Sequence, residues 1–211
     1  MDAQKGYVLV VDDILDILNL LEATLTFKGY RVVTAQNGEE ALKFIQKEHP
    51  ALIIADILMP RMDGFSLVHR LRINSETRQI PVVFLSATYV APEDKAFALS
   101  IGVTRFIEKP VDMDTFLPIV ERLMKYGAQA TVPPLKEFEF YTGYQQRLET
   151  KLAQKNVQIA RDERLLGHLS EEEKPAFEQS LQSAISEREG IQRLLVEVRE
   201  QLAKLNKPKE S

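Results

Sequence analysis

Short apolar and β-branched runs alternate along most of the chain with longer segments in which apolar residues recur every three or four positions. The short runs predict strands, and the longer segments predict amphipathic helices. The predicted strands are residues 7–12, 30–35, 51–56, 80–86 and 104–108. The helical period follows them over residues 14–25, 41–45, 65–71, 96–99 and 116–123. Because parallel strands need crossover helices, this alternation predicts an α/β fold with a doubly wound, five-stranded parallel sheet.

The hydrophobic period changes towards the end of the chain. Gly127 and two prolines interrupt the pattern, so we expect residues 1–125 to form one domain and residues 126–136 to form a linker. Over residues 137–211 apolar positions step by alternating three and four along two segments that flank a polar break. The seam positions are Tyr141, Gln145, Leu148, Leu152, Lys155, Ile159, Asp162, Leu166 and Leu169, then Phe177, Leu181, Ala184, Arg188, Ile191, Leu195, Val198, Leu202 and Leu205. Heptad spacing of this kind predicts an all-α antiparallel coiled-coil hairpin.

The overall composition narrows the classes of protein and partner. The 211 residues include no cysteine, which excludes disulfides and thiolate metal sites. The net charge of -4 is divided into -3 over residues 1–125 and -1 over 126–211, so neither part has the basic surface typical of nucleic-acid binding. We find no signal peptide and no run of about eighteen apolar residues. We therefore expect a soluble cytoplasmic protein that binds no nucleic acid and no membrane.

Polar residues stand at the ends of four predicted strands: Asp12 and Asp13, Asp56, Ser86, and Lys109. Each of them alone would be an ordinary cap, turn or surface residue. The carboxyl ends of parallel strands meet at one edge of a sheet, so we expect the five side chains to converge on one crevice. Two unpaired carboxylates about 4 Å apart repel by roughly 4 kcal/mol at an effective dielectric constant near 20. A hard divalent cation removes this repulsion, and Mg²⁺ is the usual choice where phosphate oxygens complete its coordination.

Four segments resemble, in order and spacing, the receiver domain of bacterial response regulators. They are VVDD at 10–13, DILMPRMDG at 56–64, PVVFLSA at 81–87 and FIEKP at 106–110. The resemblance covers residues 5 to about 125 and implies a flavodoxin-like receiver fold. It also implies a two-component signalling switch rather than an enzyme with a separate substrate, with a sensor histidine kinase as partner and Mg²⁺ as cofactor. Such a switch catalyses its own phosphorylation and dephosphorylation.

The same resemblance implies roles for the residues of the crevice. Asp56 would be the nucleophile that takes a phosphoryl group from a phosphohistidine, and Lys109 would pair with the phosphoryl oxygens. Asp12 and Asp13 would hold Mg²⁺ together with Asp56 and the backbone carbonyl of Leu58. We also expect the apolar Leu58 side chain to screen the acyl phosphate from water and to lengthen its lifetime.

Three further positions are predicted to transmit the switch. Ser86 would hydrogen-bond to the phosphoryl oxygens and move towards them, and Phe106 would turn into the space that this movement leaves. The alternative for Phe106 is a strand aromatic packed in the core. The resemblance implies a cis bond between Lys109 and Pro110, and we expect Gly64 to occupy a turn with positive φ.

The predicted hairpin lies outside the resemblance, and its function has several open interpretations. It could pair with a second hairpin in a four-helix bundle and make a homodimer, or it could bind a protein effector. Alternatively, it is a phosphotransfer or kinase-like dimerisation element, because His168 lies near its tip in LLGHLSEEE. Two rival hypotheses concern the whole chain. A phosphohydrolase is disfavoured by the leucine at position 58, and an inert structural adaptor is disfavoured by the complete set of site residues.

Overall fold

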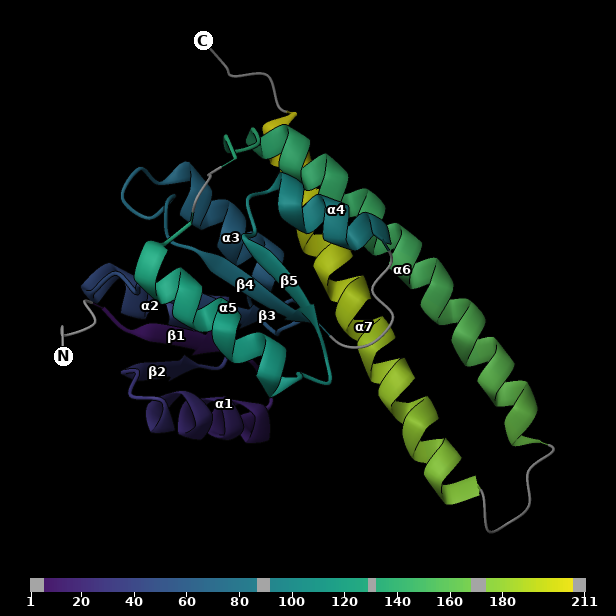
Figure 1. Cartoon of the computed structure of the whole chain (residues 1–211). Helices are drawn as coiled ribbons and strands as arrows, with labels where there is room; N and C mark the ends of the chain where they lie inside the picture. Colours follow the sequence, from purple (N-terminus) through teal and green to yellow (C-terminus); the bar gives the residue numbers. More distant parts are fainter. Residues whose placement is uncertain (1–5, 87–91, 129–131, 168–173, 207–211) are drawn as a thin grey trace. The chain divides into compact units, whose positions relative to one another are not determined.

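The computed structural model describes residues 6–86, 92–128, 132–167 and 174–206 (Figure 1). The chain divides into two compact units, Met1–Leu135 and Lys136–Ser211. The first unit is a sheet covered by helices, and the second is a pair of long helices. His168, at the predicted tip of the hairpin, and the predicted seam position Leu169 lie outside the described residues. None of the helices in the described ranges is both long enough and apolar enough to cross a membrane.

The first unit is built on a five-stranded parallel sheet with the strand order β2-β1-β3-β4-β5. The strands are β1 (Val8–Val11), β2 (Val32–Ala35), β3 (Leu52–Asp56), β4 (Val82–Ser86) and β5 (Arg105–Glu108). The chain passes from β1 to β2 on one side and then to β3, β4 and β5 on the other. The carboxyl ends of β1 and β3 therefore flank the crevice at which doubly wound sheets bind their ligands.

Five helices cover this sheet. They are α1 (Leu15–Phe27), α2 (Gly38–Lys47), α3 (Gly64–Ile73), α4 (Pro92–Ser100) and α5 (Met113–Tyr126). The side chains of Asn37, Asp63 and Asp112 cap α2, α3 and α5 by accepting hydrogen bonds from backbone N–H groups of the first turn. A cap of this kind stabilises a helix by about 1 kcal/mol. The predicted fold class, a doubly wound α/β unit followed by a helical hairpin, is confirmed.

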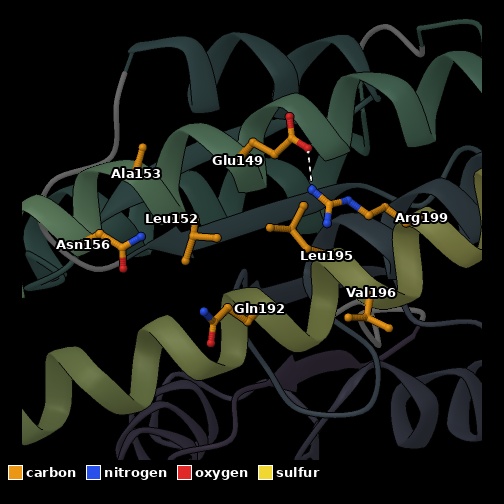
Figure 2. Close-up of a pocket in the computed structure, with 8 residues that line it drawn as sticks. All are labelled: Glu149, Leu152, Ala153, Asn156, Gln192, Leu195, Val196 and Arg199. Atoms are coloured by element: carbon orange, nitrogen blue, oxygen red, sulfur yellow. Dashed lines mark hydrogen bonds and ion pairs between the residues drawn. The ribbon is translucent and has the colours of Figure 1, made fainter.

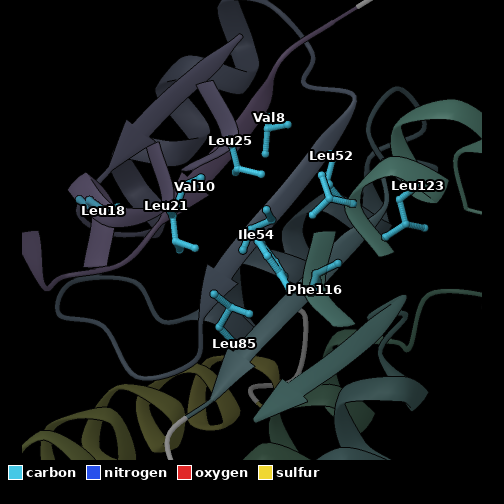
Figure 3. Packing of buried hydrophobic residues seen from close by; sticks show 12 residues of the cluster. Val8, Val10, Leu18, Leu21, Leu25, Leu52, Ile54, Leu85, Phe116 and Leu123 are labelled. Atoms are coloured by element: carbon cyan, nitrogen blue, oxygen red, sulfur yellow. The ribbon is translucent and has the colours of Figure 1, made fainter. Parts of the chain in front are cut away.

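The main apolar core lies on the face of the sheet that α1 and α5 cover (Figure 3). Its buried members are Val8, Val10, Leu18, Leu21, Leu25, Leu52, Ile54, Val83, Leu85, Phe116, Val120 and Leu123. Successive strand residues point to opposite faces, so Phe84, between two members of this core, points to the other side. There its ring meets Phe65 of α3 edge-on, with 5.4 Å between the ring centroids. Both faces are covered, which explains why the strands read as nearly continuous apolar runs.

The second unit is an antiparallel pair of helices. They are α6 (Glu137–Leu166) and α7 (Lys174–Leu205). The 30 residues of α6 extend about 45 Å. Ion pairs between the helices include Glu149 with Arg199 and Lys155 with Glu187, each with 2.9 Å between nitrogen and oxygen. The buried positions of the predicted seams are Leu148, Ile159, Asp162, Ala184, Ile191, Leu195 and Val198. The two helices pack along these seams, as the heptad spacing predicts.

Gly64 begins α3, and the structure corrects the reason expected for a glycine there. The positive φ in the loop after β3 belongs to Arg61, at 68°, and not to Gly64. A Cβ atom on Gly64 would instead overlap the carbonyl oxygen of Asp56 and approach Ile57 Cα and the Phe84 ring to 3.1 Å. The prediction was wrong because a left-handed turn and a close backbone approach both select glycine, and the sequence does not distinguish them.

We expect Gly64→Ala to lower the free energy of unfolding by about 3 kcal/mol, the upper part of the range for overpacking, because its Cβ meets backbone that cannot move without displacing β3. Gly29→Ala is the matched control. Gly29 has a φ of 89° but no heavy atom within 4 Å of an added Cβ, so only backbone strain applies. That strain amounts to about 1–2 kcal/mol. Urea denaturation measures both variants, and a Gly64→Ala loss no larger than that of Gly29→Ala would contradict the close-approach explanation.

Candidate functional site

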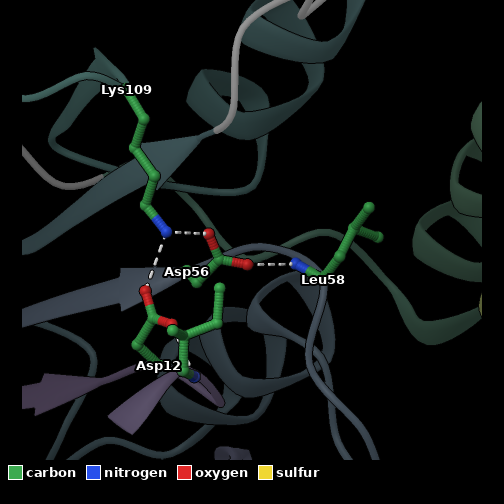
Figure 4. Close-up of polar contacts among 5 residues, drawn as sticks. Asp12, Asp56, Leu58 and Lys109 are labelled. Carbon is green, nitrogen blue, oxygen red and sulfur yellow. Dashed lines mark hydrogen bonds and ion pairs between the residues drawn. The ribbon is translucent and has the colours of Figure 1, made fainter. Parts of the chain in front are cut away.

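Four strands deliver the predicted site residues to one edge of the sheet. Asp12 directly follows β1, Asp56 is the last residue of β3, Ser86 is the last residue of β4, and Lys109 directly follows β5. These strands are parallel, so their carboxyl ends lie on the same side. Figure 4 shows Asp12, Asp56 and Lys109 meeting at this edge, with side chains from three different strand ends.

The Lys109 ammonium is the centre of the site. Its Nζ donates one hydrogen bond to Asp12 Oδ2 and one to Asp56 Oδ1, each 2.8 Å long (Figure 4). The side chains are largely withdrawn from solvent, with exposed fractions of 17% for Lys109, 2% for Asp12 and 13% for Asp56. Charge-assisted hydrogen bonds of this length are about twice as strong as neutral ones. One cation therefore holds two carboxylates that would otherwise repel each other.

Backbone amides hold the second oxygen of each carboxylate. Asp12 Oδ1 accepts a hydrogen bond of 2.9 Å from the N–H of Ile14, and Asp56 Oδ2 accepts one of 2.9 Å from the N–H of Leu58. In both cases the donor lies two residues beyond the aspartate, which is the geometry of an Asx turn. The turn that ends each strand thus also fixes the orientation of its carboxylate. These two amide donors could not be predicted from the sequence, since main-chain donors leave no side-chain signal.

The single ammonium does not fully compensate the buried negative charge. Burial raises the pKa of Asp56, and the opposing effect of Lys109 is too small to cancel the rise. Burial alone would lower the pKa of Lys109, but the carboxylates of Asp56 and Asp12 outweigh it and raise that pKa. Lys109 therefore stays protonated, while the ionised form of Asp56 is held at a cost in free energy.

Asp13 lies beside this cluster but not within its hydrogen bonds. Asp13 is exposed, whereas the preceding Asp12 is buried. Partial burial of the Asp13 carboxyl raises its pKa, and the negative charge of Asp12 adds to the rise. Across the described ranges, no three side chains of Asp, Glu, His or Cys are grouped closely enough to hold a metal ion. The structure thus brings two of the three predicted carboxylates onto Lys109 and leaves the third in solvent next to them.

The donor set nevertheless fits a hard divalent cation. All candidate donors are oxygens, namely three carboxylates and the Leu58 carbonyl, and Mg²⁺ prefers oxygen ligands. Asp12 and Asp56 share the Lys109 ammonium and Asp13 lies next to them, so three carboxylates face one cation, and burial raises the pKa of Asp13 and Asp56. A dication beside Asp13 would relieve this excess charge.

The remaining predicted positions lie around this edge. Ser86 is buried, with 6% of its surface exposed, and its carbonyl accepts a hydrogen bond from the Lys109 amide. Phe106 is half-buried on β5 and pairs in register with Phe84 of β4. The bond between Lys109 and Pro110 is cis, as expected. The roles of these residues in a switch stay predictions, because the loop after Ser86 lies outside the described residues.

Comparison with known proteins decides the family. The family model for the response regulator receiver domain matches residues 8–121, which is more than half of the chain. The chain belongs to the response regulator receiver family. The resemblance found in the sequence motifs is confirmed, and the first unit is a receiver domain of the kind that serves two-component signalling.

Individual receiver relatives match the same part of the chain. The "Probable transcriptional regulator ycf27" of Porphyra purpurea is 41% identical over 110 residues, which are 52% of this chain and 44% of that protein. The signal receiver domain of a histidine kinase from Syntrophus aciditrophicus is 34% identical with a TM-score of 0.54, and the match covers 59% of this chain and 94% of that one. The chemotaxis response regulator CheY4 of Vibrio cholerae is 36% identical with a TM-score of 0.52, over 56% of this chain and 98% of that one. The chain therefore spans less than half of the curated relative it matches.

We expect Asp56→Asn to stabilise the receiver domain at neutral pH in buffer that contains EDTA. An acid whose pKa is raised in the folded state loses stability as the pH rises from its ordinary value of 3.8 through the folded-state value. The gain from Asp56→Asn should therefore be absent below about pH 3.8 and should grow above it. Urea denaturation between pH 3 and pH 7 measures the effect.

Lys109→Met is the opposing control in the same titration. This variant removes the cation and leaves both carboxylates buried, so it should lose about 2 kcal/mol at neutral pH, the size of a charged hydrogen bond, and less in acid. A gain from Asp56→Asn that does not change between pH 3 and pH 7 would contradict the proposed charge balance.

Proposed function

We propose that this protein is a phosphorylation-dependent signalling switch in which Asp56 takes a phosphoryl group from the phosphohistidine of a sensor histidine kinase. The observation that carries the proposal is the Asp56 carboxylate at the sheet edge, hydrogen-bonded at 2.8 Å to the Lys109 ammonium. Membership of the receiver family supports it further. A carboxylate oxygen would form the new O–P bond as the P–N bond of the phosphohistidine breaks, and the imidazole would leave.

The residues of the site have the charges that this transfer needs. Phosphoryl transfer passes through a loose transition state, so catalysis depends on positioning and on positive charge at the equatorial oxygens. Lys109 would redirect one hydrogen bond from a carboxylate to a phosphoryl oxygen. Asp12, Asp13, Asp56 and the Leu58 carbonyl would hold Mg²⁺, which supplies the remaining positive charge. The buried Asp12 would keep Lys109 oriented throughout.

Phosphorylation would add about 1.5 to 2 negative charges next to the carboxyl end of β4. We infer that the Ser86 hydroxyl then turns to donate a hydrogen bond to a phosphoryl oxygen. Phe106 on β5 is half-buried and would turn into the space that the movement of Ser86 leaves. The change at the site would in this way reach the outer surface of β5.

The hairpin of α6 and α7 would provide the output through protein contacts. We infer self-association or binding of a protein effector, because exposed apolar side chains remain on the hairpin after its two helices have packed. Val196 on α7 is 56% exposed and lines an apolar groove together with Leu152, Ala153 and Leu195. A contiguous exposed apolar surface made by several side chains marks an interaction site.

Acetyl phosphate with Mg²⁺ should add about 80 Da, one PO₃ unit, to the intact chain. We expect intact-mass spectrometry to find this adduct in the wild type and in Asp114→Asn, a control at an exposed aspartate in the first turn of α5. Asp56→Asn should remain unmodified, and EDTA should abolish the adduct in every variant. An adduct that persists in Asp56→Asn or in EDTA would overturn the proposal.

Leu58→Asn should shorten the lifetime of the phosphorylated protein by about tenfold, which is 1.36 kcal/mol in the barrier to hydrolysis. Leu58 is half-buried beside Asp56, and an amide in its place would hydrogen-bond to an attacking water. Leu58→Met keeps an apolar side chain and should leave the lifetime within about twofold. Loss of the mass adduct with time, after acetyl phosphate is removed, measures the rates. Equal lifetimes in Leu58→Asn and the wild type would count against the screening role.

A further inference from the structure

The face of α7 that points away from the predicted seam carries a regular pattern of charge. Glu189, Arg193, Val196, Glu200 and Lys204 follow one another in steps of four, three, four and four residues, which places them on one side of the helix. All five are exposed. We call these residues the outer stripe. Along the helix the five side chains are negative, positive, apolar, negative and positive in turn.

The charges of the outer stripe are not used within the chain. Glu149 with Arg199 and Lys155 with Glu187 make ion pairs between α6 and α7. By contrast, the four charged side chains of the stripe make no ion pair with any other residue in the described part of the chain, although Glu-Arg and Glu-Lys spacings of four would permit pairs along the helix. Their charges are therefore available to a partner.

The order of the charges selects one kind of partner. When a second α7 lies antiparallel about a two-fold axis near Val196, Glu189 faces Lys204 of the second copy and Arg193 faces Glu200 of the second copy. The symmetry repeats both pairs, so every charge of the stripe meets its opposite. In a parallel arrangement each charge would meet its like, which is destabilising. The stripe is thus complementary to itself, and only in the antiparallel sense.

An apolar groove adjoins the middle of the stripe. Val196 lies on its rim, and Leu152, Leu195 and Ala153 supply its apolar surface between the two helices (Figure 2). The groove has a volume of about 470 Å³. Because Val196 would lie next to the two-fold axis, the valine of each copy would cover the groove of the other.

We propose that two copies of this protein associate through the outer stripe of α7, antiparallel about a two-fold axis at Val196, with ion pairs between Glu189 and Lys204 and between Arg193 and Glu200 of the two copies. This inference rests on the self-association proposed above for the hairpin. It specifies which helix makes the contact, that the two copies of this helix run antiparallel, and which residues pair. The contact is charged and solvated, so it weakens as salt shortens the Debye length from about 10 Å at 0.1 M to about 3 Å at 1 M.

Sedimentation equilibrium of the full chain, at low salt and over a range of concentrations, tests the surface. Val196→Glu places a like charge next to the axis in both copies, and we expect the dissociation constant of the dimer to rise at least about tenfold. Val157→Glu is the matched control, because Val157 is an exposed valine on α6, outside the stripe. It should leave the dissociation constant unchanged. Circular dichroism confirms that each variant keeps its helices.

A charge exchange tests the direction of the pairing. Glu189→Lys and Lys204→Glu should each weaken self-association, because each creates like pairs in its own homodimer. An equimolar mixture of the two variants should form a heterodimer with wild-type affinity, since opposite charges then meet at both ends of the stripe. A change in helix stability would not be rescued by mixing, so failure of the rescue overturns the proposal.

The outcomes separate this inference from the function on which it rests. A wild type that stays monomeric at every concentration removes both the self-association and this interface. If the wild type dimerises and Val196→Glu dimerises equally well, self-association stands and only the outer stripe is excluded as its surface. Phosphorylation of Asp56 is measured independently and is affected by neither result.

Discussion

The ammonium of Lys109, shared between the carboxylates of Asp12 and Asp56, is the interaction on which the site depends. Both hydrogen bonds are 2.8 Å long, and they join residues that follow or end three different strands. In water each pair would contribute little, but here the side chains are mostly withdrawn from solvent and the effective dielectric constant is lower. The contact therefore ties β1, β3 and β5 together at their carboxyl ends. It also sets how much negative charge remains for a ligand to neutralise.

That remaining charge links stability to function. Burial raises the pKa of Asp56 by more than the Lys109 ammonium lowers it, so the folded domain holds an ionised side chain that it would be more stable without. Positive charge brought by a metal ion would reduce this cost, whereas phosphorylation would replace the single carboxylate charge with about 1.5 to 2 negative charges on phosphoryl oxygens. A carboxylate with a raised pKa beside a cation is typical of functional sites. The strand order enforces the condition, because it puts β1 and β3 side by side at the point where the sheet reverses.

Much of this could be predicted from the sequence, because long periodic patterns and strand ends are strong signals. The parallel sheet, the hairpin and the meeting of Asp12, Asp56 and Lys109 all follow from them. The different environments of Asp12 and Asp13 were not predicted. Consecutive residues of extended backbone point in opposite directions, so only one of an adjacent pair can face the crevice. Arg72 was also missed. It is buried on α3, where it donates two hydrogen bonds to the carbonyl of Gly102, and burial lowers its pKa to about 10. Its partner lies thirty residues away in the sequence, beyond the reach of any local pattern.

The two long faces of α7 have different roles, since the seam packs against α6 and the opposite face carries the outer stripe. The seam is only partly apolar, since Asp162 is buried on it and Arg188 has a buried Nε without a hydrogen bond. Polar groups at such positions weaken packing but fix register, as do the two ion pairs between α6 and α7. A fixed register in turn holds the outer stripe straight along one side of the hairpin, which a self-complementary charge pattern requires. Once two hairpins are joined, each brings its receiver domain to a high local concentration of the other. A contact between receivers, or between a receiver and a shared partner, then becomes effectively intramolecular and can be weak by itself while still responding to phosphorylation of Asp56.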